Sequence, residues 1–196
     1  MTQPAPSPSA RQVDLLEAAY GYALEHGLGD LSLRPLAAAI GSSPRVLLFL
    51  FGSKDGLVRA LLARARSDEL AALDQLRERQ GSHEHVGLVQ AMTEVWDWLS
   101  APSHRPLLRL WTESYAHSLV DPDGAWSGFA RSTVDDWLEV LAGSQPPAER
   151  RSAAGRNRRT LALAVLCGAL LDLLATDEQV RVSAALRHQA HLLNLG

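Results

Sequence analysis

The chain has 196 residues, enough for one or two small domains with a substantial buried core. Hydrophobic residues make up 46% and charged residues 21%, a balance that excludes a disordered or membrane-embedded chain. Leu and Ala number 64 whereas Val and Ile number 13, so the composition predicts an all-α fold. The single cysteine, Cys167, excludes a disulfide framework and a zinc site built on several cysteines.

Charge is divided unevenly along the chain. Residues 1–66 carry seven Arg or Lys against five acids, whereas residues 67–196 carry 12 Arg against 17 acids. A basic N-terminal part on an acidic remainder favours a polyanionic partner for the N-terminal part. Random scatter explains so small an excess equally well.

The N-terminal segment MTQPAPSPSA is too polar for a signal peptide, and it predicts a disordered tail over residues 1–10. The longest uninterrupted apolar stretch, residues 161–171, is about half as long as a bilayer requires. We therefore expect a cytoplasmic protein with no membrane partner.

Apolar residues recur at helical spacing along the rest of the chain, and breaks rich in Gly, Pro and Ser separate the segments. Ser32, Ser43 and Ser53 stand where helix N-caps are expected, and Thr176 with Gln179 forms a potential capping box. Nine or so helices are predicted, over residues 11–26, 33–40, 44–51, 53–80, 88–99, 107–119, 126–141, 148–175 and 177–194.

The segment from Ser32 to Lys54 has the pattern of a helix-turn-helix unit, two short helices joined by a tight turn that contains Gly. Ala37 supplies the small residue where the helices cross, and Gly41 supplies a residue that tolerates positive φ. Inward-facing apolar anchors are expected at Leu36, Ile40, Leu47 and Leu50. The same spacing also arises by chance in chains rich in Ala and Leu.

The flanking residues resemble the TetR family of bacterial transcriptional regulators. Glu25–Gly27 matches the Glu-x-Gly end of the family's first helix, and Ser32–Arg34 matches the start of its second. Phe51–Leu57 matches the family's Phe-x-Ser-Lys-acid-x-Leu exit from the recognition helix. The resemblance covers residues 11–66, and beyond about residue 70 only the architecture is similar. It implies a homodimer with a helix-turn-helix DNA-binding domain at 11–57 and a ligand-binding and dimerisation domain at 58–196.

The resemblance also implies which residues meet DNA. The recognition helix at residues 44–50 would lie in the major groove of double-stranded operator DNA, where Arg45 can pair with guanine O6 and N7. Lys54 would meet a phosphate at the N-terminus of the next helix. A solvated charge is the alternative for Arg45. The expected DNA-binding residues are Ser32, Arg34, Ser42, Ser43, Pro44, Arg45, Leu48, Phe49 and Lys54.

One departure from the family pattern lies late in the recognition helix, where Leu48, Phe49 and Leu50 replace the usual Tyr and His. Apolar side chains there could contact thymine methyl groups, pack against the following helix, or indicate weak or lost DNA binding. Because few side chains are available to neutralise phosphates, we expect a shallow dependence of DNA affinity on salt.

Aromatic residues concentrate in the predicted helices between residues 88 and 141, where they would suit a flat apolar ligand. Such residues at helical spacing also occur simply as core, and a ligand cavity is implied by the family resemblance. The expected ligand-binding residues are Met92, Trp96, Trp111, Tyr115, Phe129 and Trp137, with Glu113, Ser114, His117 and Thr133 as polar neighbours.

Residues 161–174 are too apolar for a helix that buries only one side. Burial against the same helix of a second subunit, together with the final helix, would form a four-helix, two-fold interface. The expected interface residues are Leu163, Leu166, Leu170, Leu171, Leu174, Leu186 and Leu193. Full burial within one subunit is the alternative.

Other functions find little support. The sequence lacks a nucleophile elbow, a phosphate loop and a dinucleotide fingerprint, so we expect no enzyme and no cofactor. The pairs His83 with His85 and His188 with His191 lack further ligands, so no metal site is expected. An arginine cluster over 150–159 is interpreted as a solvated helix start.

The sequence thus predicts a ligand-responsive transcriptional regulator, a repressor that binds a near-palindromic operator as a dimer and is released by a small lipophilic or aromatic effector. The alternative is a small-molecule-binding helical dimer of the same fold with weak or lost DNA binding.

Overall fold

The structure is a computed structural model that describes residues 9–81 and 87–194. The tail expected at residues 1–10 lies almost wholly outside them. The described residues form ten α-helices, one 3₁₀-helix and no strand, which confirms the predicted all-α fold. The helices are α1 (Ala10–His26), α2 (Leu33–Ala39), α3 (Pro44–Phe51), α4 (Lys54–Gly81), α5 (Leu88–Ser100), η1 (Pro102–His104), α6 (Arg105–Val120), α7 (Phe129–Gly143), α8 (Pro147–Arg151), α9 (Ala153–Thr176) and α10 (Gln179–Asn194).

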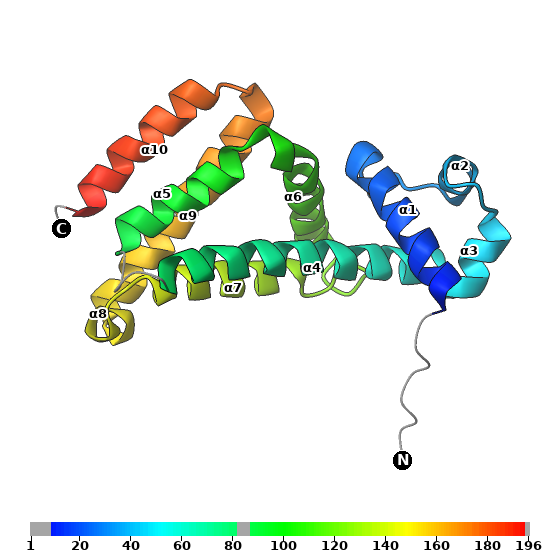
Figure 1. The fold of residues 1–196 in the computed structure, drawn as a ribbon, viewed down its shortest axis with the longest axis horizontal. Coiled ribbons are helices and arrows are strands. Elements are labelled where there is room, and N and C mark those ends of the chain that lie inside the picture. Colours follow the sequence, from blue (N-terminus) through cyan, green and yellow to red (C-terminus); the bar gives the residue numbers. More distant parts are fainter. Residues whose placement is uncertain (1–8, 82–86, 195–196) are drawn as a thin grey trace, which may run out of the picture.

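The molecule has two ends that are joined by the long helix α4 (Figure 1). Helices α1, α2 and α3 form one end, where α4 packs against α1 and α3. Helices α5 to α10 form the body, where α4 packs against α7. The domain boundary expected at residue 57 falls within the first turn of α4, so one continuous helix belongs to both ends.

The turn between α2 and α3 follows from its local sequence. Gly41 has a φ of +63°, a conformation that glycine adopts without strain. The Ser43 hydroxyl accepts a hydrogen bond from the backbone N–H of Val46 at 3.3 Å, and Pro44 occupies the first helical turn of α3. Helices α2 and α3 are consequently inclined by 102°, within the range of helix-turn-helix units.

Three helix boundaries differ from the predicted ones. The helix expected over residues 148–175 is split at Ser152, whose hydroxyl caps α9 by accepting the N–H of Gly155 at 2.9 Å. Thr176 and Gln179 form no capping box, because Asp177 turns left-handed and ends α9. Trp126 lies in the turn before α7 rather than within the helix. Ser32 stands at the N-cap position of α2, but its side chain makes no capping bond.

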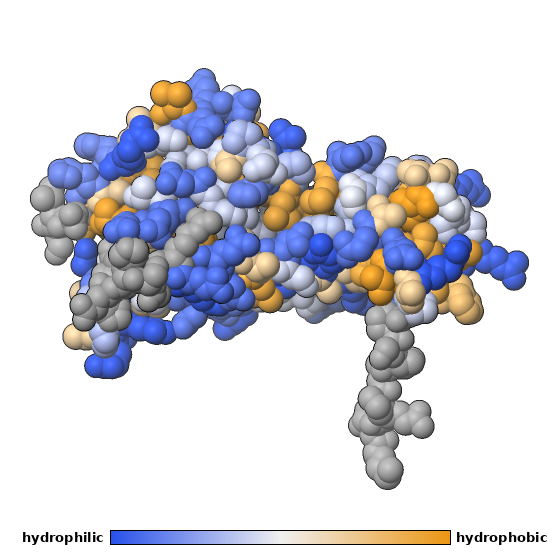
Figure 2. Space-filling model, in the orientation of Figure 1, coloured by the Kyte–Doolittle hydropathy of each residue, from blue (hydrophilic) through white to orange (hydrophobic). Residues whose placement is uncertain are grey.

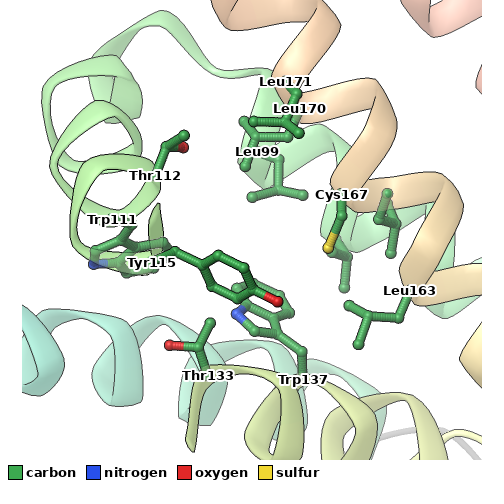
Figure 3. A pocket seen from close by; sticks show the side chains of 12 residues that line it. Leu99, Trp111, Thr112, Tyr115, Thr133, Trp137, Leu163, Cys167, Leu170 and Leu171 are labelled. Carbon is green, nitrogen blue, oxygen red and sulfur yellow. The ribbon is translucent and has the colours of Figure 1, made fainter. Parts of the chain in front are cut away.

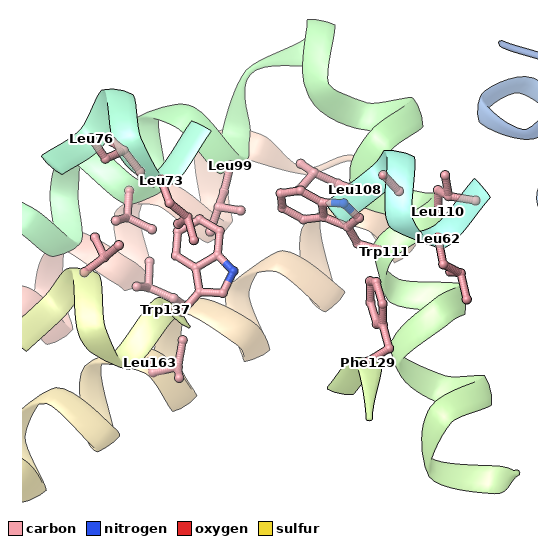
Figure 4. Packing of buried hydrophobic residues seen from close by; sticks show 14 of the residues in the cluster. Leu62, Leu73, Leu76, Leu99, Leu108, Leu110, Trp111, Phe129, Trp137 and Leu163 are labelled. Atoms are coloured by element: carbon pink, nitrogen blue, oxygen red, sulfur yellow. The ribbon is translucent and has the colours of Figure 1, made fainter. Parts of the chain in front are cut away.

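A single cluster of buried apolar residues extends through both ends of the molecule. Figure 4 shows the part of it in which α4, α6, α7 and α9 contribute side chains. Leu36, Ala37 and Leu47 anchor the helix-turn-helix unit, and all three are almost fully buried. In the body, the ring of Trp98 stacks on that of Trp111, with 5.6 Å between the ring centroids. Burial of large apolar side chains contributes about 1.5–3 kcal/mol each, so this shared cluster stabilises the placement of the two ends.

Helix α9 is long and apolar enough to cross a bilayer by length and composition. In the protomer it packs against α5, α7 and α10. Its apolar residues therefore contribute to the helical body, and part of its surface remains uncovered.

Candidate DNA-binding surface and effector cavity

Helix α3 presents its polar N-terminus and an apolar pair to solvent. Arg45 is exposed, and Lys54 is exposed at the start of α4. Leu47 is buried, but Leu48 is 40% exposed and Phe49 is 86% exposed. Phe49 therefore does not pack against α4, which removes that explanation for Phe49. Figure 2 shows hydrophobic surface at this end of the molecule.

The other residues expected at DNA differ in accessibility. Ser32 and Arg34 are exposed, whereas Ser42, Ser43 and Pro44 are half-buried. The hydroxyl oxygen of Ser42 is buried, so in this conformation the hydroxyl is poorly placed to donate a hydrogen bond to a DNA phosphate. Within the described part of the chain, Arg34, Arg45 and Lys54 form no ion pair, so their charges remain available to a polyanion.

The body contains a cavity of about 320 Å³ between α5, α6, α7 and α9 (Figure 3). Trp111, Tyr115 and Trp137, three of the six expected ligand-binding residues, line it. Tyr115 extends into the space towards Trp137 (Figure 3). The lining is Val95, Leu99, Trp111, Thr112, Tyr115, Thr133, Trp137, Leu163, Leu166, Cys167, Leu170 and Leu171. It contains no charged side chain, so an ionic ligand would lose its hydration without gaining a counter-charge.

The other three expected ligand-binding residues lie outside this cavity. Met92 is fully buried, and Trp96 donates its indole N–H to the Ser183 hydroxyl at 2.9 Å, joining α5 to α10. Phe129 lines a separate hollow beside α4. Helical spacing alone could not separate them from the cavity residues, because a helix packed on several sides has more than one inward stripe.

Residues of α9 complete the cavity. Leu163, Leu166, Leu170 and Leu171 line it, although they were expected at a dimer interface. Cys167 lies between them and is exposed, and desolvation by the surrounding apolar side chains raises the pKa of its thiol. No local sequence signal separates a cavity leucine from an interface leucine.

A buried carboxylate connects the cavity to α4. Glu69 is fully buried, and its carboxylate accepts the indole N–H of Trp137 at 3.0 Å. Arg66 pairs with both Glu69 and Asp136, which joins α4 to α7. Burial raises the pKa of Glu69 above its ordinary value, and Arg66 opposes that rise. Trp137 therefore contacts both the cavity and α4, the helix that leads to the end formed by α1, α2 and α3. We call this end the DNA-binding end, after the role expected for α3.

The expected dimer interface needs correction at four positions, because Leu163, Leu166, Leu186 and Leu193 are buried inside the protomer. Leu170 and Leu174 are half-buried, whereas Leu171 is 54% exposed. The side of α9 that does face outward carries small and apolar residues at spacings of three and four. We call it the α9 stripe, and it consists of Leu161, Ala164, Gly168, Leu171 and Ala175.

Arginines of the 150–159 cluster are largely engaged within the body. Arg150 pairs with Glu139 at 2.5 Å, and Arg158 pairs with Glu149 at 2.8 Å. Arg159 donates to the side chain of Gln145 at 3.1 Å. Among residues 9–81 and 87–194 no group of three potential metal ligands comes together, and His83 and His85 lie outside these ranges.

The geometry defines a class of protein: an all-α protein with a helix-turn-helix unit at one end and an apolar cavity in its body. Residues 15–61 match the family model described as "Bacterial regulatory proteins, tetR family". No curated protein sequence matches the chain.

Solved structures share the whole fold. A transcriptional regulator from Rhodococcus sp. Rha1 aligns over 93% of this chain and 95% of its own, with 19% identity and a TM-score of 0.67. The fatty acid degradation regulator FadR from Bacillus halodurans aligns over 96% of each chain, with 14% identity and a TM-score of 0.62. The multidrug binding protein EbrR, complexed with proflavin, aligns over 91% of this chain and 98% of its own, with 21% identity and a TM-score of 0.58. Residues 15–61 therefore resemble the bacterial regulatory proteins of the TetR family, and the chain as a whole shares the fold of these solved structures.

Proposed function

We propose that the protein is a cytoplasmic, dimeric repressor that binds a near-palindromic operator and is released by a small, uncharged lipophilic or aromatic effector. The observation that carries this proposal is the position of Trp137, which lines the cavity and donates to Glu69 of α4. Helix α4 begins at Lys54 beside the recognition helix. Cavity and DNA-binding end are thereby connected through one helix.

In the DNA complex, α3 lies in the major groove with Arg45 reading a base edge and Phe49 contacting thymine methyl groups. Lys54, Arg34 and Ser32 contact phosphates. The exposure of these five side chains and the absence of ion pairs at the three charged ones, within the described residues, support these roles.

Dimerisation uses the α9 stripe together with the exposed face of α10. Ala164 and Gly168 carry little or no side chain, so two copies of α9 can approach closely there. Leu171 belongs to the stripe and also lines the cavity, so a second subunit would cover the cavity beside it. An α9–α10 pair from each subunit then forms the four-helix interface.

The effector is expected to be neutral, because no charged side chain lines the cavity. Its volume of about 320 Å³ is at the lower end of small-molecule sites, so the ligand is compact. The Tyr115 hydroxyl offers a polar contact. A ligand that displaces Trp137 shifts the population of α4 orientations and hence the separation of the two recognition helices.

The test begins with DNA. A duplex selected by the wild-type protein from a random pool is bound by Arg45→Ala and Lys54→Ala variants in an anisotropy titration. Loss of the Arg45 base contact should weaken binding by roughly 10-fold or more, and loss of Lys54 by a smaller factor on every sequence. Arg151→Ala, which removes an exposed arginine of the body, is the matched control. Unchanged affinity in both variants would remove these two residues from the interface.

The dimer is tested separately. Leu171→Arg places a charge in the α9 stripe and should yield monomers in sedimentation velocity, because an unpaired charge in an apolar interface is costly. Leu119→Arg makes the same change on an exposed leucine of α6 and should leave the dimer intact. A Leu171→Arg protein that remains dimeric would contradict the proposed interface.

The second candidate, a ligand-binding dimer with weak DNA binding, is favoured by one observation: the exposed apolar pair Leu48 and Phe49. The selection experiment separates the two functions. A wild-type protein that enriches no sequence from the pool, while still binding a neutral dye in the cavity, would establish the second.

A further inference from the structure

Helix α6 packs against α1, and one carboxylate of α6 adds hydrogen bonds to the segment that follows α1. Glu113 of α6 accepts the backbone N–H of Leu28 at 2.9 Å and that of Gly29 at 2.5 Å, one on each carboxylate oxygen. These amides belong to the segment 27–32 that joins α1 to α2. Hydrogen bonds to an ionised group are about twice as strong as neutral ones, so this pair of bonds is a strong connection between the two ends.

Two glycines make room for this carboxylate. A Cβ atom on Gly27 would lie 2.9 Å from a carboxylate oxygen of Glu113, and Gly27 also has a φ of +78°. A Cβ atom on Gly29 would lie 2.7 Å from the other oxygen and 2.9 Å from Nε2 of His117, one turn further along α6. A side chain at either position would therefore require the Glu113 carboxylate to move from where it accepts the two amides.

The opposite side of α6 faces the cavity. Trp111 and Tyr115 line the cavity and stand two residues before and two residues after Glu113. Two residues correspond to about 200° around a helix, so Glu113 points away from the cavity side. Helix α6 thus lies between the cavity and the segment 27–32. A ligand that pushes on α6 also pushes on the loop that Glu113 holds.

This connection is separate from the one through α4. Helix α1 is joined to α4 by the Tyr20 hydroxyl, which donates to Asp68 at 2.8 Å, and by Arg64, which pairs with Glu17 at 2.7 Å. Trp137 and Glu69 act on α4 alone. The helix-turn-helix unit is therefore held from two sides, by α4 and by α6.

We propose that Glu113 is a positioning residue that couples the effector cavity to the helix-turn-helix unit: its carboxylate ties the segment 27–32 to α6, so displacement of α6 reorients α2 and α3. The coupling role rests on the proposed function, since it needs both an effector in the cavity and DNA at α3.

The test measures coupling rather than stability. N-phenyl-1-naphthylamine, a neutral fluorescent aromatic, serves as the cavity probe, and the duplex selected by the wild-type protein serves as the DNA. In the wild-type protein the dye should bind the DNA complex about fivefold or more weakly than the free protein, as linkage requires of an effector that releases DNA. Glu113→Gln keeps the size of the side chain but leaves one acceptor for two N–H donors.

In Glu113→Gln the ratio of the two dye affinities should fall to within about twofold of unity, while dye binding to the free protein stays unchanged within about twofold. Glu25→Gln is the matched control, because it removes the same charge from an exposed position at the same end of the molecule. Gly29→Ala, whose Cβ atom would displace the Glu113 carboxylate, should reproduce the loss of coupling. A ratio in Glu113→Gln equal to that of the wild-type protein would overturn the proposal.

Failure of the proposed function gives a different result. If dye and duplex do not influence each other in the wild-type protein, the effector part of the proposed function is wrong. The positioning role of Glu113 is then tested without dye, by measuring the duplex affinity and the amide hydrogen exchange of Glu113→Gln. The variant should bind the duplex about threefold or more weakly than Glu25→Gln, and the Leu28 and Gly29 amides should exchange about tenfold or more faster. Unchanged affinity and exchange would overturn the positioning role.

Discussion

The two ends of the molecule differ in the ion pairing of some arginines and in the exposure of their phenylalanines. In the body, Arg150 and Arg158 are neutralised by neighbouring carboxylates, and Phe129 is buried. At the DNA-binding end, within the described residues, Arg45 and Lys54 form no ion pair, and Phe49 is 86% exposed. Because Arg151 of the body is also exposed and forms no ion pair within the described residues, a free charge alone does not identify a partner surface, and the exposed Phe49 ring is the feature that distinguishes the α1–α3 end.

The largest expected effect is the difference in stability between a variant of the buried Phe129 and a variant of the exposed Phe49. Phe129→Ala should lower the free energy of unfolding by about 3–5 kcal/mol, because it leaves a cavity in the core. Phe49→Ala should change it by less than about 0.5 kcal/mol and should instead weaken duplex binding. Chemical denaturation and anisotropy measure the two quantities. A strongly destabilised Phe49→Ala protein would mean that this ring is structural.

Phe49 allows a sharper version of the same comparison. If its ring contacts thymine methyl groups, replacing thymine by uracil at single positions of the selected duplex should weaken wild-type binding. The same replacements should have no effect on Phe49→Ala. Equal sensitivity of both proteins would exclude the methyl contact.

An intermediate effect is expected at the connection between the cavity and α4. Trp137→Phe keeps an aromatic ring but removes the N–H that Glu69 accepts, and it should cost about 1–3 kcal/mol of stability. Trp96→Phe, which removes the N–H bonded to Ser183, provides the matched loss away from the cavity. Only the Trp137 variant should alter how strongly the dye weakens duplex binding.

Salt dependence compares the exposed charges directly. With about two phosphate contacts per subunit, the slope of log affinity against log salt should be roughly −4 for a dimer. Arg34→Ala should reduce its magnitude by about 2 per dimer, and Arg151→Ala should leave it unchanged. A slope of about −8 or steeper would show that further basic residues contact the phosphates.

The smallest effect concerns pH. Because burial raises the pKa of Glu69 in the folded protein, its contribution to stability is fully present below its ordinary pKa and is lost as the pH rises through the raised value. Relative to Glu69→Gln, the wild-type protein should therefore lose stability as the pH rises from the ordinary carboxyl pKa of about 4.3 through the raised pKa. Denaturation midpoints of both proteins across this range measure the difference, and parallel curves would contradict it.

Sequence patterns predicted the DNA-binding end better than the body. Gly41, Ser43 and Pro44 fix the turn by local chemistry, so their effects are readable from a few neighbouring residues. The role of Leu163, by contrast, depends on which helices surround α9, and that is decided by packing between distant segments. The same reason explains why Met92 and Trp96 were expected in the cavity.

Two polar residues of the body show most clearly what the sequence could not predict. Glu113 was expected beside the ligand but accepts two amides of the α1–α2 segment, 84 and 85 residues away in the chain. Glu69 carried no signal at all, since a charged residue in a predicted helix is ordinarily exposed. The Gly27-x-Gly29 spacing was visible, but only the structure shows which carboxylate it accommodates.

Lys54, the first residue of α4, is the only lysine in the chain. Amine-directed reagents can therefore modify one side chain, and that side chain is exposed at the DNA-binding end. A fluorophore or an acetyl group placed there would mark a single known side chain without mutagenesis. Protection of this amine by duplexes of different sequence would then map occupancy of the groove by mass spectrometry.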